Sequence, residues 1–448
     1  MIAPTVLVAQ YRGTIDVSDT TRADMRVSQP VLVITESLPN NPPNPPQRKV
    51  LIAADLSTNP VARLGLRGAR WDFGLSYAPS LTLPDVELGF NPTGRGADNP
   101  PFLAMHNANS AFAWHDRFTR VTIREAASYG ELLDTLPATS LGGATPAGAT
   151  QAGSAMGTAQ TSPPSMAMAS NSLTQQLLVP KALEYGSSAT TASIATQVGR
   201  RATLSVSGGF QIGGGLNSES WTQIGSEHGL NAAASFSYTF SRLDSLGVTA
   251  SAEEIYTAVC AQLGNTGPPV TCQKYAPDGQ LVATFSHRLS RRAGLSLTAG
   301  AAAYYNVTTT DEEEIVIQPV GTATLNGTFG PHGSRSFSLS AALAPYIDPT
   351  TGSPRNRIQS TGTLSAPLPN RLALNVTAGV LESLPWPVAD PNPLTSITCM
   401  AEVRRRLNPR LDVAIGAQVL WQSQIGYPSV GSEIGYISVS ATAPTLRF

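Results

Sequence analysis

The sequence predicts a transmembrane antiparallel β-barrel of about 18 strands, with short periplasmic turns and long extracellular loops. From Leu230 to Ser241, apolar and small polar residues alternate, and a period of two describes a strand with one apolar face and one polar face. The chain then turns at residues 242–246 and returns in a second alternating run. Most of the chain repeats this unit, which is typical of outer-membrane barrels.

The composition agrees with a barrel wall. Charged residues make up 13% of the chain, about half of the share in soluble proteins. No run of apolar residues is long enough for a helical membrane span, which needs about 18 or more. A soluble β-sandwich or solenoid also alternates, but solenoid repeats are shorter and more regular. The net charge of −1 argues against nucleic acid as a partner.

Residues 1–57 form an N-terminal segment with three candidate strands and a proline-rich linker at residues 40–46. Proline cannot lie in a strand interior, so we expect one candidate to be the first wall strand and residues 58–448 to form the barrel. Residues 1–10 fit the end of a signal peptide that begins upstream.

From residue 61 onward the chain is a series of hairpins. Eight short turns join sixteen strands, and one further strand at each end gives eighteen, an even number with both termini on the periplasmic side. The turns are predicted at residues 69–70, 115–118, 199–201, 242–246, 290–292, 330–335, 369–371 and 406–410.

Residues 130–187 interrupt this series with a long loop. Its centre is a low-complexity run of Ala, Gly, Ser, Thr and Pro, which predicts disorder or loose packing. Loops of this length are usually either functional or disordered. Two interpretations remain open: a constriction folded into the barrel, and a surface loop.

Aromatic residues are sorted along the strands. Trp71 and Trp114 lie near short turns, whereas Tyr77 and Tyr129 lie near long loops. Two aromatic belts separated by an aliphatic band indicate two interfaces between water and lipid, so we expect an outer-membrane location.

The chain ends in Phe448, which resembles the terminal aromatic residue that serves as an insertion signal for the barrel-insertion machinery. Leu446 shares the parity of Phe448, but the apolar residues Ile437 and Val439 upstream have the other parity. A β-bulge near Pro444 would reconcile the two.

Catalysis is not predicted. The five histidines fall in different loops and turns without metal-ligand spacing, and no nucleophile, metalloprotease or phosphate-loop motif is present. We therefore expect no enzyme activity, metal or cofactor. Cys260 and Cys272 lie in one loop and form a possible disulfide in an oxidising compartment, while Cys399 lies in a strand.

The inward face predicted by parity carries small neutral hydrogen-bonding groups, in a barrel wide enough for an aqueous lumen. Few charges share this face, and no ring of one sign is visible of the kind that selects ions. Small polar residues that only face water, without any role in transport, would give the same pattern. The predicted lumen-lining residues are Ser205, Ser207, Gln211, Asn231, Ser235, Ser237, Thr239, Ser296, Thr298, Thr322, Thr324, Asn326, Ser338, Ser340, Asn375, Thr377 and Gln418, with Asp72, Arg124, Glu402, Arg404 and Asp412 as the main charges.

Arginines crowd around the short turns and predict a positive periplasmic rim. Such a rim suits anionic phospholipid or an acidic periplasmic partner. Together with the barrel form, this makes outer-membrane lipid and lipopolysaccharide the expected surroundings of the chain.

Several stretches together resemble one family. They are similar to the myxobacterial outer-membrane barrels of Wzy-dependent exopolysaccharide export, over a region from about residue 60 to the C-terminus. The resemblance implies a porin-like channel that passes secreted polysaccharide from the periplasm to the cell surface, with a periplasmic polysaccharide translocon as a possible partner. A general diffusion porin for small solutes and a barrel scaffold or adhesin are the alternatives. The stretches are residues 70–85, 111–130, 183–204, 419–424 and 445–448.

Overall fold

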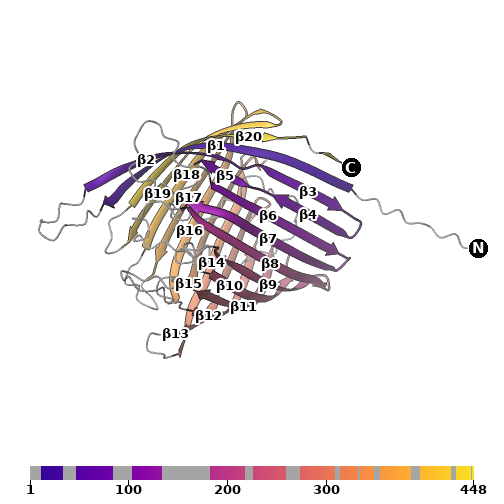
Figure 1. The fold of residues 1–448 in the computed structure, drawn as a ribbon. Helices are drawn as coiled ribbons and strands as arrows, with labels where there is room; N and C mark the ends of the chain where they lie inside the picture. Colours follow the sequence, from indigo (N-terminus) through magenta and orange to yellow (C-terminus); the bar gives the residue numbers. More distant parts are fainter. Residues whose placement is uncertain are drawn as a thin grey trace, which may run out of the picture.

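The computed structural model describes twenty-one strands, which form one antiparallel sheet (Figure 1). The described residues are 12–33, 47–83, 103–133, 182–216, 226–258, 273–307, 313–330, 333–347, 354–384, 394–424, 430–444 and 446–447. The strands are β1 (Arg12–Val33), β2 (Gln47–Thr58), β3 (Val61–Arg67), β4 (Trp71–Tyr77), β5 (Ser80–Leu83), β6 (Leu103–His115), β7 (Thr119–Leu133), β8 (Ala182–Val198), β9 (Ala202–Gly215), β10 (Ser226–Thr239), β11 (Asp244–Ala258), β12 (Gln273–His287), β13 (Ala293–Val307), β14 (Glu313–Phe329), β15 (Arg335–Ile347), β16 (Pro354–Leu368), β17 (Leu372–Ser383), β18 (Leu394–Asn408), β19 (Leu411–Gln424), β20 (Val430–Thr442) and β21 (Leu446–Arg447).

In three places, two consecutive strands together form one wall strand. The twenty-one described strands therefore make a wall of eighteen, as predicted. β2 and β3 both pair with β1 and form a single wall strand, interrupted at residues 59–60. β4 and β5 both pair with β6 and are interrupted at residues 78–79. β21 continues β20, and both pair with β1, which closes the barrel.

Each interruption contains a proline. Proline has no backbone N–H to donate to the ladder, so the strand pairing is interrupted at that residue. Thr58 faces Leu81 and Ala62 faces Tyr77, so Pro60 and Pro79 lie opposite each other on adjacent wall strands. The register is unchanged across both interruptions.

The first part of the described wall is formed by β1 and β2. The predicted division between residues 57 and 58 falls at the end of β2, inside one wall strand, and residues 12–33 and 47–57 pair with other strands of the wall. β1 spans two of the candidate strands. The register between β1 and β2 shifts between Ser28 and Val31, and this bulge accommodates Pro30 within the strand.

The short turns and both ends of the wall lie on one side of the barrel (Figure 1). Arg12, at the start of β1, faces Arg67 at the end of β3, and β21 pairs with residues 14–15 near the same edge. Regular strands such as β8, with 17 residues, exceed what a tilted membrane crossing requires. β7 and β8 extend into the predicted loop 130–187, whose residues 134–181 lie outside the described part.

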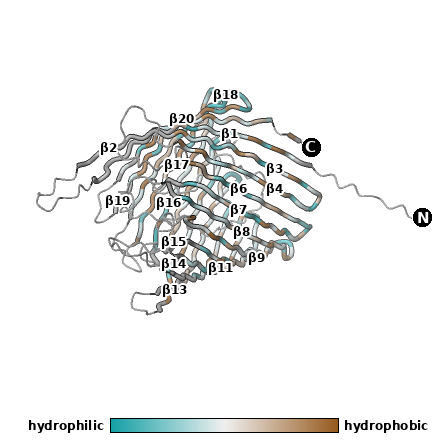
Figure 2. Tube along the Cα trace, viewed as in Figure 1, coloured by the Kyte–Doolittle hydropathy of each residue, from teal (hydrophilic) through white to brown (hydrophobic). Residues whose placement is uncertain are grey.

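Large apolar side chains point outward and are exposed. Leu230 and Phe236 on β10 are 55% and 46% exposed, while Asn231 and Ser235 between them are half-buried. The hydropathy map shows the same alternation along the strands (Figure 2). Such a surface is stable only against lipid, and a closed barrel is the one sheet form that pairs every wall strand there. No helix among the described residues is long and apolar enough to cross a membrane.

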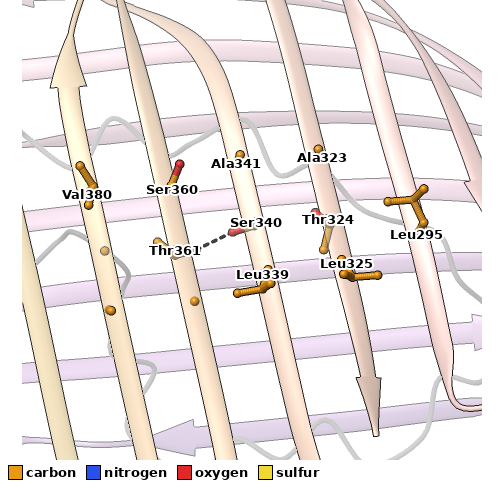
Figure 3. Close-up of a pocket in the computed structure, with 13 residues that line it drawn as sticks. Leu295, Ala323, Thr324, Leu325, Leu339, Ser340, Ala341, Ser360, Thr361 and Val380 are labelled. Carbon is orange, nitrogen blue, oxygen red and sulfur yellow. Dashed lines mark hydrogen bonds between the residues drawn. The ribbon is translucent and has the colours of Figure 1, made fainter.

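The outer face has a shallow hollow over β13–β17 (Figure 3). Its lining includes the small residues Ala341, Ser360 and Gly362 and the leucines Leu325 and Leu339. Since these leucines share the lipid-facing parity, the hollow opens to the membrane and not to the lumen.

The last strand contains the predicted bulge. Thr442 faces Ser18 and Leu446 faces Ile15, so four positions on this strand match three on β1. The extra residue near Pro444 turns Leu446, which is 61% exposed, to the outer face. Phe448 lies outside the described residues, and its role as an insertion signal stays a prediction.

Closure between the first and last wall strands can be tested by cross-linking. Thr20 and Ser440 face each other, with their hydroxyl oxygens 3.1 Å apart. In a chain whose three native cysteines are serine, we expect Thr20→Cys with Ser440→Cys to form a disulfide. After cleavage in an extracellular loop, non-reducing electrophoresis should show the two fragments joined. Thr20→Cys with Val439→Cys, on opposite faces of the wall, is the matched control and should not cross-link.

Candidate functional site

The inner wall of the barrel is the candidate site. All seventeen predicted lumen-lining residues lie on the face opposite the exposed apolar side chains. For example, Ser205 and Ser207 alternate on β9 with Leu204 and Val206, which are 41% and 51% exposed. That these residues line an open pathway stays a prediction.

Hydroxyl groups on this face bond to each other across neighbouring strands. Ser205 and Ser235 are 2.6 Å apart between their Oγ atoms, Thr284 and Thr298 are 3.1 Å apart between their Oγ1 atoms, and Ser286 and Ser296 are 3.3 Å apart. Ser340 and Thr361 make the same contact on β15 and β16 (Figure 3). Such pairs stabilise the sheet and leave a wall that is neutral, with part of its hydrogen-bonding capacity satisfied.

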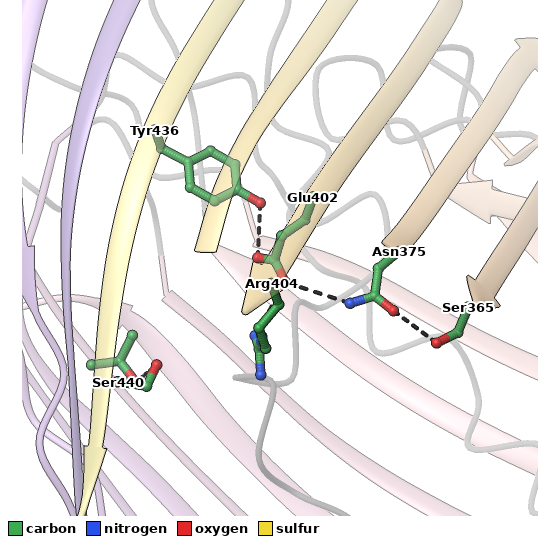
Figure 4. A network of polar contacts seen from close by, with 7 residues as sticks. Ser365, Asn375, Glu402, Arg404, Tyr436 and Ser440 are labelled. Atoms are coloured by element: carbon green, nitrogen blue, oxygen red, sulfur yellow. Dashed lines mark hydrogen bonds and ion pairs between the residues drawn. The ribbon is translucent and has the colours of Figure 1, made fainter. Parts of the chain in front are cut away.

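A charged network lies on the inner face of β16, β17, β18 and β20 (Figure 4). Its centre is Glu402 on β18, whose side chain is mostly buried. The Glu402 carboxylate accepts hydrogen bonds from the Tyr436 hydroxyl at 3.1 Å, from Arg404 at 3.2 Å and from the Asn375 amide at 3.5 Å. Ser365 donates to Asn375 at 2.8 Å and extends the network to β16.

Tyr436 connects this network to β1. The guanidinium carbon of Arg22 lies 3.7 Å from the centre of the Tyr436 ring, a cation–π contact. The ring packs over Gly416 on β19, where a Cβ atom would overlap it. Tyr436 is 5% exposed, so the network is held rigidly against the wall.

Further charges continue this part of the wall. Arg67 and Asp72 form an ion pair at 2.8 Å between β3 and β4, and Asp16 faces Arg63. We define the charged arc as the inner face of β18–β20 and β1–β7, and the hydroxyl arc as the inner face of β9, β10 and β12–β16. The described charges of the charged arc are Asp16, Arg22, Arg63, Arg67, Asp72, Arg120, Arg124, Glu402, Arg404, Arg406 and Asp412.

Parity places the predicted charges Asp72, Arg124, Glu402, Arg404 and Asp412 on this inner face. The sequence analysis missed Arg22 and Tyr436, because β1 had no assigned parity and its pairing with β20 joins the two ends of the chain. Tyr436 alternates in sequence with Ile437, which is exposed on the outer face, and this alternation could have placed Tyr436 on the inner face.

Other predicted features lie elsewhere. Cys399 is exposed on the outer face of β18, and the possible disulfide between Cys260 and Cys272 falls outside the described residues. The described residues contain no group of three His, Cys, Asp or Glu side chains that would hold a metal ion.

No protein-family model and no curated protein matches this chain. Among solved structures, it is similar to Pseudomonas aeruginosa OpdK with vanillate, at 10% identity over 96% of this chain and 99% of the other, with a TM-score of 0.43. It is also similar to Pseudomonas aeruginosa OccK9 (OpdG), at 11% identity over 96% and 98%, with a TM-score of 0.45. A third similar structure is Acinetobacter baumannii OccAB4, at 10% identity over 96% of this chain and 98% of the other, with a TM-score of 0.40.

The fold assignment rests on the strand pairings described above. The closed wall, the apolar outer face and the polar inner face define a transmembrane β-barrel protein of the bacterial outer membrane. The resemblance to exopolysaccharide-export barrels stays a prediction.

Two glycines on adjacent strands test the packing of the network. We expect Gly416→Val to displace the Tyr436 ring and to lower the free energy of unfolding by about 1–3 kcal/mol, the usual range for overpacking. Gly435→Val, on the outer face of β20 with open space around its Cβ position, should be neutral or slightly stabilising. Urea unfolding in detergent, followed by tryptophan fluorescence, gives both values. Equal effects would contradict the rigid packing of Tyr436.

Proposed function

We propose that this protein is a passive outer-membrane channel through which small polar solutes diffuse. The observation that carries this proposal is the charged arc, which holds most of the described inward-facing charges, of both signs, while the rest of the described inner wall bears mainly hydroxyl groups, with Glu253, Asp278 and Arg357 as further charges. No reacting group or cofactor is needed for this activity, and the direction of transport follows the concentration gradient.

The two arcs have different effects on a solute. Hydroxyl groups exchange hydrogen bonds with water and with neutral solutes at similar free energy, so they retain neither strongly. The charged arc produces a field across the lumen that orients dipolar and ionic solutes. Because hydrogen bonds and packing hold Glu402 and Tyr436 in place, this field persists without rearrangement of the wall.

Polysaccharide export is the second candidate. The hydroxyl arc favours it, since a neutral hydrated polymer would slide over many weak, exchangeable hydrogen bonds. The charged arc argues against it, because an uninterrupted neutral bore would suit such a polymer better. We therefore place diffusion of small solutes first.

Liposome swelling separates these functions. We expect liposomes that contain the purified full chain to swell rapidly in monosaccharides and disaccharides, with a rate that falls as the size of the sugar increases. A channel closed to disaccharides but permeable to a long neutral glycan would reverse the order of the two candidates. A barrel closed to both would support a scaffold.

Ion selectivity tests the charged arc. A unit charge about 10 Å from an ion in water contributes about 0.4 kcal/mol, or about a twofold change in ion occupancy. Because cations and anions respond in opposite directions, we expect Glu402→Gln to shift the permeability ratio toward anions by about fourfold at low salt, and Arg404→Gln to shift it equally toward cations. Reversal potentials in planar bilayers under a KCl gradient measure both shifts.

Glu382→Gln is the matched control, because Glu382 is an exposed residue on the outer parity of β17. It should leave the reversal potential unchanged. If all three variants conduct like the unmodified protein, the charged arc does not face the conduction pathway.

A further inference from the structure

Arginines gather at the periplasmic edge of strands β8 to β15. Four consecutive short turns connect these strands in pairs, at residues 199–201, 240–243, 288–292 and 330–334. We define the arginine rim as the arginines of these turns together with the one that begins β15, and all of them are exposed. The rim comprises Arg200, Arg201, Arg242, Arg288, Arg291, Arg292 and Arg335.

The positive charge of the rim is not balanced by neighbouring acids. Asp244, at the start of β11, is the one acidic residue in these turns and the strand residues next to them. Its Oδ1 atom lies 2.5 Å from Nδ1 of His287, and its Oδ2 atom accepts a hydrogen bond from the Ser241 hydroxyl at 2.6 Å. Among the described residues, no arginine of the rim forms an ion pair. The rim therefore holds a net positive charge that suits an anionic ligand.

Hydrogen bonds join the four turns into one surface. Each turn is linked to the next, so the guanidinium groups are anchored side by side along the edge of the sheet. The linking bonds run from Thr239 N–H to Arg201 O and from Arg288 N–H to Leu243 O, both at 2.8 Å, and from Arg292 Nη1 to Gly330 O at 3.1 Å.

Exposed apolar side chains lie in the same turns as the arginines. Leu243 and Leu289 are 51% and 53% exposed, and Phe240, next to Arg242 in the chain, is 46% exposed. Apolar groups are unfavourable in water, whereas at the boundary between lipid headgroups and acyl chains both kinds of side chain find favourable surroundings. The rim is therefore suited to the level of the phospholipid headgroups.

We propose that the arginine rim binds the phosphate groups of anionic phospholipids in the periplasmic leaflet of the outer membrane. A guanidinium group donates two parallel hydrogen bonds to phosphate oxygens, and it is less strongly hydrated than a lysine ammonium group. The rim stretches contain no lysine. Leu243 and Leu289 contact the acyl chains of the same lipids, a contact that a soluble acidic partner would not provide.

Native mass spectrometry of the full chain in detergent tests the lipid preference. We expect phosphatidylglycerol to bind about tenfold more tightly than phosphatidylcholine with the same acyl chains. Arg288→Gln with Arg291→Gln should lower the association constant for phosphatidylglycerol about tenfold and leave that for phosphatidylcholine unchanged. Neither side chain forms a hydrogen bond with the described residues, so heat-dependent migration on electrophoresis should show an intact barrel.

Arg70→Gln with Arg117→Gln is the matched control. Both arginines are exposed in short turns on another part of the periplasmic edge, with Asp72 and Asp116 beside them in the chain. This variant should change phosphatidylglycerol binding by less than about twofold. Inorganic phosphate should not displace the lipid, because it has no acyl chains. Equal affinity for the two lipids, equal losses in the two variants, or displacement by inorganic phosphate would overturn the proposal.

Discussion

The structure depends on a closed ladder of backbone hydrogen bonds. In hydrocarbon, a backbone N–H or C=O group without a partner costs several kcal/mol, and a sheet avoids unpaired edges only by pairing its last strand with its first. β1 and β20 make this contact over twelve residue pairs. Once the ring is closed, each residue has a fixed side, and the period of two converts sequence parity directly into lipid-facing or inward position.

Much of the barrel could be predicted because its determinants are local. A strand such as β10 carries its two faces in adjacent residues, and short turns mark where each hairpin reverses. The N-terminal region could not be predicted in this way. Pro30, Pro60 and Pro79 look like strand ends in the sequence, but a bulge or a short interruption accommodates each of them within the wall. Whether a proline ends a strand or only interrupts it depends on the neighbouring strand.

The inner wall was partly predictable for the same reason. Parity identified the hydroxyl residues and Glu402, but it cannot show which side chains meet. The contact of Arg22 with Tyr436 joins opposite ends of the chain, and it exists only because closure sets their register.

The opposed prolines give the wall a mechanical asymmetry. At Pro60 and Pro79, neighbouring wall strands each lack a donor at the same level, so the ladder between them has a local gap, while the strands pair on both sides of it. We expect the hydrogen-bonded pairs next to this gap to open more readily than those in the middle of unbroken hairpins.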